Sequence, residues 1–315
     1  MMSIYFENGG MMTTVQDGGR FGYQQFGVSP AGPMDTKAFH LANILVGNDW
    51  EESALETTYM GPQIRFGTSN IIAVTGADMQ PCVDGNPIPM CEAVLVQKDS
   101  VLTFKGLVNG CRGYIAFAGG LDIPVVMDSK ATLVRNAMGG VEGRKIQKGD
   151  EIKFAAPKET LSNMEIRKAP KEVYPSKEVT LRVVLGPQDD MVGIEGIHQF
   201  FWNSAVISNE FDRMGCRLEC EPLKQLGDGN IISDGIACGA IQIPTNGKPI
   251  IMMTDRQTTG GYTKIGNVIS VDLPKLAQAQ PGFKVRFIQV GIELAQDLYI
   301  RQKQEFKNLE QRLGG

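Results

Sequence analysis

The chain has 315 residues, of which 42% are hydrophobic and 21% are charged, so it can bury two cores and is not expected to be disordered. Its formal net charge is -4 and its lysines and arginines are scattered, which argues against the basic surface that nucleic acids bind. The first ten residues carry no basic run, and no apolar run approaches the roughly 20 residues of a membrane span. We therefore expect a cytoplasmic protein without a nucleic-acid or membrane partner.

Most of the predicted elements are short strands. Glycine is abundant, and short β-branched runs recur between turn residues, which is typical of small β-barrels or sandwiches. The clearest predicted strands are 71–75, 114–117, 179–185, 240–243 and 250–253. Similar turn-and-strand patterns recur at 98–104, 148–154 and 281–287, as two domains of similar build would produce. The sequence predicts a mainly β protein with few helices.

Two helices stand out. Asp35 is suited to cap a helix that presents an apolar face and stops at Gly47. His40 lies beside that face, where we expect a structural histidine. Residues 292–313 form an amphipathic pattern, which predicts a helix that packs on its own domain or contacts another protein chain.

The domain boundaries follow from composition. Residues 155–177 are rich in Lys, Glu and Pro and show little apolar periodicity, which is typical of a linker. We predict an N-terminal β-barrel domain over 1–160, a linker over 161–178, a C-terminal β-barrel domain over 179–290 and a terminal helix over 291–315.

The cysteines and histidines indicate no metal site. The six cysteines fit reduced, mostly buried thiols better than a disulfide framework. Cys216 and Cys220 lie four residues apart, but no second pair or nearby histidine completes a zinc set.

One candidate site is the glycine-dense segment 13–35. It contains Asp17, Arg20 and Asp35 in a stretch that has little to bury, and such backbone serves tight turns or close approach to a ligand. The alternative is a turn-rich hairpin in which Asp17 and Arg20 form an ordinary ion pair.

A second candidate site follows the predicted strand 250–253. Polar residues on a loop after a buried strand are a common way to present a binding site. The residues concerned are Asp255, Arg256, Thr258, Thr259, Gly260, Gly261 and Tyr262. The amides of Gly260 and Gly261 could bind an anion, although a plain β-turn would look the same. Arg213 and Arg217, four residues apart, could clamp a carboxylate, although in isolation they look like ordinary surface residues.

Two nucleotide motifs are missing. The chain contains no phosphate-binding loop ending in Gly-Lys-Ser or Gly-Lys-Thr, and no G-x-G-x-x-G that opens a helix after a strand. The sequence thus predicts no dinucleotide site and no such loop for ATP.

These segments carry a resemblance to a known family. VQDGGRFGYQQFGVSPAGPMD, AFAGGLDIP, DRMGCRL, SDGIACGAIQIP and DRQTTGGYTKIG occur in one order over residues 13–290. In that order they resemble the KipA family, whose members are also called allophanate hydrolase subunit 2-like proteins or C-type subunits of 5-oxoprolinase. The resemblance implies two cyclophilin-like β-barrel domains in tandem.

The resemblance also implies a function in a complex. Such chains work with a KipI-like protein, the B-type subunit, and a LamB/YcsF-like protein, the A-type subunit, in the ATP-dependent opening of 5-oxoproline to glutamate. We expect the chain to be inactive alone, with ATP used by the complex and no covalently bound cofactor. Asp17, Asp35 and Asp255 are the candidate bases. Arg20, Arg213 and the Gly260–Gly261 amides would hold the anion, while Thr258, Thr259 and Tyr262 orient it.

Two other functions remain open from the sequence. A related pair of domains forms the carboxyltransferase part of urea carboxylase, in which carboxybiotin would come from a partner, since this chain has no Met-Lys-Met biotin acceptor. A third function is a binding protein that sequesters a KipI-like inhibitor. Asp128 and Thr263 depart from the family pattern, and either could alter the choice of substrate.

Overall fold

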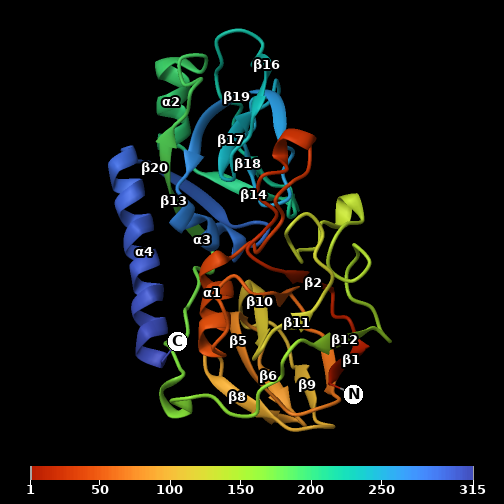
Figure 1. Cartoon of the computed structure of the whole chain (residues 1–315). Coiled ribbons are helices and arrows are strands. Elements are labelled where there is room, and N and C mark those ends of the chain that lie inside the picture. The colour runs from red at the N-terminus through yellow and green to blue at the C-terminus, as the bar shows by residue number, and fades with distance from the viewer. Residues whose placement is uncertain (1, 315) are drawn as a thin grey trace. The chain divides into compact units, whose positions relative to one another are not determined.

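The computed structural model describes residues 2–314, which form two compact units (Figure 1). Unit 1 contains residues 2–21, 31–174 and 303–314, whereas unit 2 contains Gly22–Pro30 and Pro175–Gln302. Strands dominate both units, which confirms the mainly β prediction. No helix of the described residues is long and apolar enough to cross a membrane.

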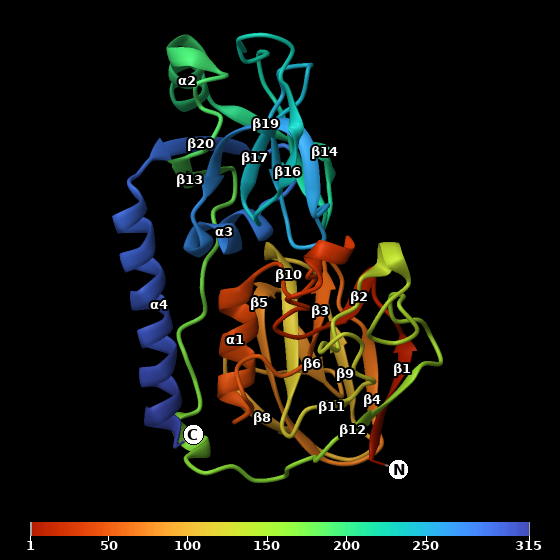
Figure 2. The ribbon, with the colours of Figure 1, turned by 45° about the horizontal axis from the view of Figure 1, so that its top comes forward.

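Unit 1 has two β-sheets (Figure 2). The first sheet has the strand order β11 (Leu121–Asp122), β12 (Glu151–Phe154), β1 (Ser3–Asn8), β4 (Gln63–Phe66), β9 (Val101–Phe104), β6 (Pro81–Val83) and β7 (Asn86–Pro87). The second has the order β2 (Met12–Gln16), β3 (Ala54–Thr58), β10 (Asn109–Phe117), β5 (Asn70–Asp78) and β8 (Ala93–Val96). Short 3-10 turns lie at η2 (Val134–Asn136) and η3 (Met164–Ile166).

The second half of strand β10, residues 114–117, is continuously apolar because both of its faces are buried. Successive strand residues point to opposite faces of a sheet. Ile115 and Phe117 belong to the core that residues of both sheets share, whereas Tyr114 and Ala116 pack in a second core with helix α1 (Thr36–Leu45). Because both faces of the strand are buried, polar residues do not alternate with apolar ones.

Helix α1 begins and ends as its sequence predicts. Asp35 is the N-cap, and its Oδ1 accepts a hydrogen bond from the backbone N–H of Ala38 at 2.9 Å. Gly47 follows the last turn with a φ of 69°, the left-handed conformation that glycine adopts without strain.

Unit 2 is a closed barrel. Its sheet has the order β13 (Glu178–Leu185), β20 (Lys284–Gln289), β14 (Ala205–Phe211), β15 (Gly215–Glu219), β18 (Ile250–Met252), β17 (Ala240–Ile243), β19 (Thr259–Val268) and β16 (Asn230–Gly235). An additional pairing of β13 with β19 joins the sheet to itself. Gly266 permits this closure, because a Cβ there would lie 2.5 Å from a methyl group of Val183.

The helices of unit 2 were predicted less well. Helix α2 (Gly193–Trp202) and helix α3 (Leu273–Ala277), which follows the 3-10 turn η4 (Ser270–Asp272), were not predicted. The segment Gly22–Pro30, with its 3-10 turn η1 (Gln24–Phe26), also belongs to unit 2. There the Ser29 hydroxyl donates a hydrogen bond to the backbone oxygen of Arg256 at 2.6 Å.

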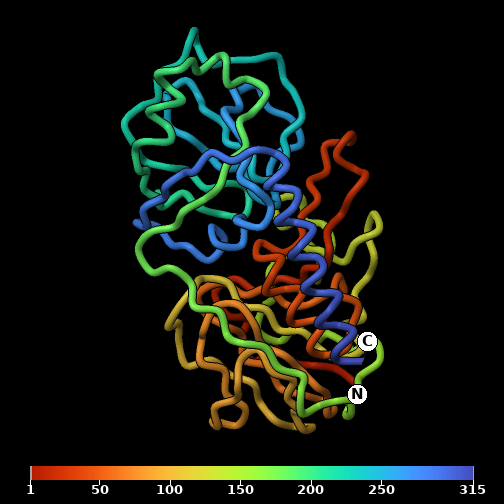
Figure 3. Tube along the Cα trace, turned by 90° about the vertical axis from the view of Figure 1, so that its left-hand side faces the viewer, coloured from red at the N-terminus to blue at the C-terminus, as the bar shows by residue number. Residues whose placement is uncertain are grey.

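The predicted linker is largely part of unit 1, whose chain continues to Tyr174. Figure 3 traces this segment, in green, along unit 1. Arg167 fastens it there, because the residue is only 3% exposed and its guanidinium donates hydrogen bonds to the backbone oxygens of Ile44, Leu45 and Leu313. This segment, although rich in charge and proline, is therefore held on unit 1 by hydrogen bonds together with the apolar contacts of Leu161, Met164 and Ala169.

The predicted terminal helix is α4 (Ile292–Leu313), and its last turns complete the second core of unit 1. The Phe306 ring meets the rings of His40 and Trp50 edge-on, with centroids 5.4 and 6.1 Å away. This end of the amphipathic stripe packs within its own chain, as expected.

The burial of His40 predicts a loss of stability in acid. Burial, helped by the charge of Lys303 and opposed by that of Asp49, lowers the pKa of His40 from 6.5 to about 4. The unfolded chain therefore binds a proton that the folded chain does not, so stability falls as the pH falls from about 6.5 towards 4. At pH 5 this protonation should cost roughly 2 kcal/mol, at 1.36 kcal/mol per pKa unit.

Urea unfolding of the wild type and of His40→Gln at pH 7.5 and pH 5 measures this cost. The wild type should lose roughly 2 kcal/mol more than the variant between the two pH values, because glutamine does not titrate. An identical loss in both proteins would show that His40 does not carry the effect.

Candidate functional site

Asp17 and Arg20 of unit 1 hold one loop, residues 126–131. The Asp17 carboxylate accepts hydrogen bonds from the Ser129 hydroxyl at 2.6 Å and from the backbone N–H of Lys130. The guanidinium of Arg20 is fully buried and donates to the backbone oxygens of Val126 and Ala131, at 2.8 and 3.0 Å. The position of Arg20 supports a structural role in place of the anion-binding role that we expected.

The departure at Asp128 lies in the same loop. Asp128 and the preceding Met127 have φ values of 59° and 52°, a left-handed conformation in which Asp and Asn are enriched among residues other than glycine. The aspartate thus suits the local turn, whatever its effect on a substrate.

Asp35 is engaged within the fold of unit 1. Besides capping α1, its carboxylate accepts a hydrogen bond from the Tyr174 hydroxyl at 3.3 Å, and its side chain is almost wholly buried. The neighbouring Tyr114 hydroxyl donates to Glu56 at 2.7 Å and accepts from the backbone N–H of Asp35. This buried network supports a structural role for Asp35 and leaves it poorly placed to meet a substrate.

Arg213 and Asp255 of unit 2 form a bidentate ion pair. The two nitrogen–oxygen distances are both 2.9 Å, and the arginine and aspartate side chains are only 11% and 6% exposed. The backbone N–H of Asp255 also donates to the backbone oxygen of Arg213, so the two chain segments are joined twice. The arginine that we expected to bind an anion therefore already holds the carboxylate that we expected to be a base.

Gly260 and Gly261 lie in strand β19 rather than in the loop that we expected. Gly260 is the register partner of Asp234 in the adjacent strand β16. A Cβ on Gly260 would approach the amide nitrogen of Gln242 to 2.8 Å and a methyl group of Ile236 to 2.7 Å. Close packing, and not a turn that presents free amides, explains the glycine at 260.

The remaining predicted residues surround this strand. Thr258 precedes it and its backbone oxygen accepts a hydrogen bond from Ile236, while Thr259 and Tyr262 are exposed. Thr263, the second departure from the family pattern, is fully buried. Its hydroxyl and its backbone N–H both donate to the backbone oxygen of Gly229 at 3.0 Å, so the additional N–H is used within the fold.

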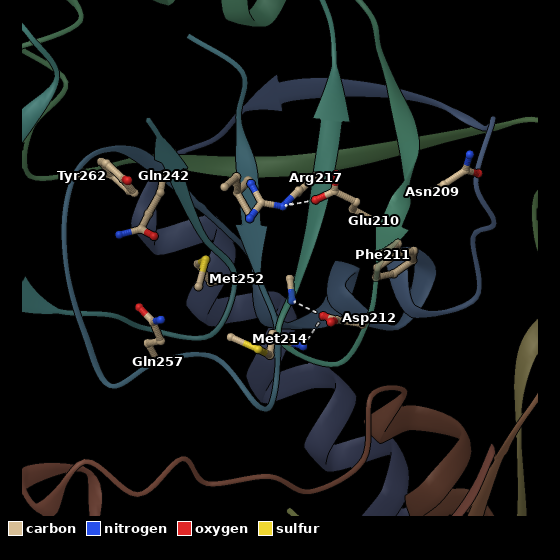
Figure 4. A pocket seen from close by; sticks show the side chains of 12 residues that line it. Asn209, Glu210, Phe211, Asp212, Met214, Arg217, Gln242, Met252, Gln257 and Tyr262 are labelled. Carbon is tan, nitrogen blue, oxygen red and sulfur yellow. Dashed lines mark hydrogen bonds and ion pairs between the residues drawn. The ribbon is translucent and has the colours of Figure 1, made fainter. Parts of the chain in front are cut away.

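A cavity of about 600 Å³ opens on unit 2 beside these residues (Figure 4). Gln242, Gln257 and Tyr262 supply neutral polar groups, and Met214, Ile250 and Met252 supply apolar ones. Arg217 at its edge pairs with Glu210 at 2.8 Å. Such a mixture of lining groups suits a small ligand that has both polar and apolar parts.

Gln242 and Gln257 were not predicted as site residues. Gln242 was included in the predicted strand 240–243, where it interrupts an otherwise apolar run. The available signal was a polar residue in a buried strand, because a buried polar group needs a hydrogen-bond partner. Gln257 lies between predicted residues and had no signal of its own.

No group of three or more metal-ligating side chains occurs among residues 2–314. What the described cavity offers is hydrogen bonding from neutral amides and a phenol, apolar contact, and the charged side chains of Glu210, Asp212 and Arg217. It can orient a small amide or carbonyl compound.

Comparison with known proteins identifies the family. The family model described as carboxyltransferase domain, subdomain A and B, matches residues 26–289. The chain is 36% identical to the C-type subunit of 5-oxoprolinase from Escherichia coli over 312 residues, which cover 96% of each chain. It is 32% identical to urea amidolyase of Saccharomyces cerevisiae over 319 residues, which are 96% of this chain but only 17% of that protein.

A solved structure agrees with these matches. The crystal structure of the Kluyveromyces lactis urea carboxylase matches with a TM-score of 0.90 at 29% identity, over 98% of this chain and 29% of that one. The resemblance that the motifs indicated is thereby confirmed, and the chain belongs to the family of carboxyltransferase domains with subdomains A and B.

Proposed function

We propose that this chain is one component of a cytoplasmic, ATP-dependent 5-oxoprolinase, acting with a KipI-like and a LamB/YcsF-like partner. The observation that carries the proposal is the match to the C-type 5-oxoprolinase subunit from E. coli across 96% of both chains. The cavity of unit 2, at about 600 Å³, is large enough for a small cyclic amide.

The reaction divides naturally between the proteins of the complex. Opening a lactam adds one water across the C–N bond, so that the carbon gains an oxygen and the nitrogen gains a proton. A lactam is a stable amide, and transfer of a phosphoryl group from ATP to its oxygen, which releases ADP, would activate the carbonyl. Attack of water on that carbon, cleavage of the C–N bond and loss of phosphate would then give the carboxylate and the amine. In this proposal the chain binds and orients the lactam, and the partners complete the site for ATP.

Of the three predicted bases, Asp17 remains the candidate. Asp35 is buried and caps the N-terminus of helix α1. Asp255 is buried and paired with Arg213. Asp17 is half-buried, and its two oxygens accept hydrogen bonds from Gly19, Ser129 and Lys130, which leaves room for one more donor such as water.

The test is ATP-dependent release of glutamate from 5-oxoproline by this chain mixed with its two partners, with each protein omitted in turn. We expect turnover only when all three are present. Asp17→Asn should lower kcat by roughly 100-fold or more while the complex still assembles, as loss of a general base does. Asp122→Asn, which changes an exposed aspartate of the same unit, is the matched control.

Two outcomes would contradict the proposal. Full turnover without this chain would remove it from the enzyme, and an assembled complex that releases no glutamate would favour the second candidate. That candidate is the carboxyltransferase half of a urea carboxylase-like enzyme, which the match to urea amidolyase favours. Carboxybiotin would then be carried by a partner, and carboxylation of urea by the mixture would detect it.

A further inference from the structure

A second cavity, of about 480 Å³, lies in unit 1 at the edge of its second core. Helix α1, helix α4 and the segment 169–174 all line it, and Figure 2 shows that segment, in green, passing between the two helices. The volume is within the range of small-molecule sites, roughly 300–1,000 Å³. None of the predicted site residues lines this cavity, so the proposed function leaves it unassigned.

The walls of this cavity are mainly apolar. Each of the three segments contributes two apolar side chains, which are Ala38, Leu41, Ala169, Pro170, Phe306 and Leu309. Two further lining groups are engaged or neutral, since the Tyr174 hydroxyl donates a hydrogen bond to Asp35 at 3.3 Å, and burial raises the pKa of the Cys91 thiol to about 11. The part of a ligand that enters the cavity should therefore be apolar.

The charged side chains that line the cavity are paired, with one exception. Lys37 pairs with Glu172 at 2.7 Å, and Lys171 pairs with Asp78 at 2.5 Å. Glu305 of α4 is exposed, and its carboxylate forms no ion pair or hydrogen bond with any other residue of 2–314. Among the described lining residues, the charge that remains available to a ligand is thus negative.

We propose that this cavity binds a small organic ammonium ion whose apolar body fills the space between α1 and α4. The body loses its contact with water against Leu41, Phe306 and Leu309, which supplies most of the affinity. The ammonium group stays at the mouth, where it meets the Glu305 carboxylate and water. An anion of the same shape would be repelled by that carboxylate, while both lysines are held by their own partners.

Such a ligand would join segments that are far apart in the sequence. Residues 37–41, 169–174 and 305–309 would all contact one molecule. A ligand that binds only the folded chain stabilises it, so the last turns of α4 should be held more firmly on unit 1. This effect does not depend on the oxoprolinase reaction, and the inference stands or falls separately from the proposed function.

The first test compares ligands of one shape, titrated into the intact chain by isothermal calorimetry. Phenethylamine and 3-phenylpropionate share a phenylethyl group and carry opposite charges. We expect phenethylamine to bind at least roughly fivefold more tightly, because Glu305 attracts one charge and repels the other. Equal binding of the two ligands, or no saturable binding of phenethylamine, would overturn the inference. This comparison needs no variant, so it holds even if a substitution impairs folding.

The same titration with L-phenylalanine distinguishes two sources of the ammonium group. An apolar amino acid carries a carboxylate beside its ammonium, and a simple amine does not. Binding as tight as that of phenethylamine would assign the ligand to apolar amino acids. Binding at least roughly threefold weaker would assign it to simple amines, because the carboxylate would find no unpaired lysine.

Variants provide the second test. Ala169→Phe should weaken phenethylamine binding roughly tenfold or more, since the new ring fills the space that the ligand needs. Val173→Phe is the matched control, because it adds a ring on the same segment at a position that is 79% exposed and does not line the cavity. Unchanged binding to Ala169→Phe would place the ligand elsewhere and overturn the inference.

A change at the surface tests the ammonium contact alone. Glu305→Gln should weaken phenethylamine binding roughly threefold to fivefold and leave 3-phenylpropionate binding no weaker. Glu310→Gln, on the same helix but outside the lining, should change neither. Equal effects of the two substitutions would overturn the role of Glu305.

Hydrogen exchange measured by mass spectrometry locates the bound ligand. With saturating phenethylamine we expect slower exchange in residues 36–45, 169–174 and 303–313, the three segments that line the cavity. Protection confined to unit 2 would overturn the inference. If the reconstituted complex releases no glutamate while phenethylamine protects these segments, the ammonium site stands and the oxoprolinase proposal fails alone.

Discussion

Replacing Arg213 with alanine will lower the free energy of unfolding by about 3–5 kcal/mol, the usual cost of removing one partner of a buried ion pair. Asp255 would keep its charge in a site that is 6% exposed, and both hydrogen bonds of 2.9 Å from the guanidinium would be lost. Urea unfolding monitored by tryptophan fluorescence or circular dichroism measures the change.

The controls separate this pair from ion pairs in general. Arg286→Ala breaks a pair with Glu178 in which the side chains are 60% and 40% exposed, and it should cost no more than about 1 kcal/mol. The double variant Arg213→Ala/Asp255→Ala should recover part of the loss, because the buried charge is gone. Equal effects of Arg213→Ala and Arg286→Ala would contradict a structural role for the buried pair.

Replacing Arg167 with methionine should destabilise unit 1 by about 3–4 kcal/mol. Methionine fills much of the space, but the backbone oxygens of Ile44, Leu45 and Leu313 lose a charged donor. These oxygens lie at the ends of α1 and α4, where the helix dipoles favour a cation. The variant should therefore loosen two helix ends with one substitution.

Hydrogen exchange measured by mass spectrometry locates the effect of Arg167→Met. We expect faster exchange in the last turns of α1 and α4 and little change in the barrel of unit 2. Arg301→Ala, which breaks an exposed pair with Asp297 on α4, should change stability by about 0.5 kcal/mol or less. Uniformly faster exchange across the chain would contradict a local role for Arg167.

The elements that could be predicted carry their signals within a few residues. Asp35 and Gly47 mark the two ends of α1, and the apolar stripe of α4 runs from Ile292 to Leu313. Helix α2 was missed because it lacks such signals: Val192 at its N-cap makes no side-chain hydrogen bond, and Gly193 begins it with a φ of 70°.

The site was harder to predict because its contacts join distant residues. Arg20 meets Val126 and Ala131 more than a hundred residues along the chain, and Arg213 meets Asp255 after 42 residues. Local composition identified these side chains as candidate site residues. It could not show that they already form hydrogen bonds with protein atoms instead of a ligand. The family followed from long motifs, which preserve order along the chain and need no contact map.

The chain order of the two units has a consequence for synthesis on the ribosome. Phe306 and Leu313 belong to the second core of unit 1, although most of that unit is made before residue 175. Unit 2 in turn includes Gly22–Pro30, which is made long before its barrel. Neither unit has all its parts when the first half of the chain has emerged, so the nascent protein must hold an incomplete core until translation has almost finished.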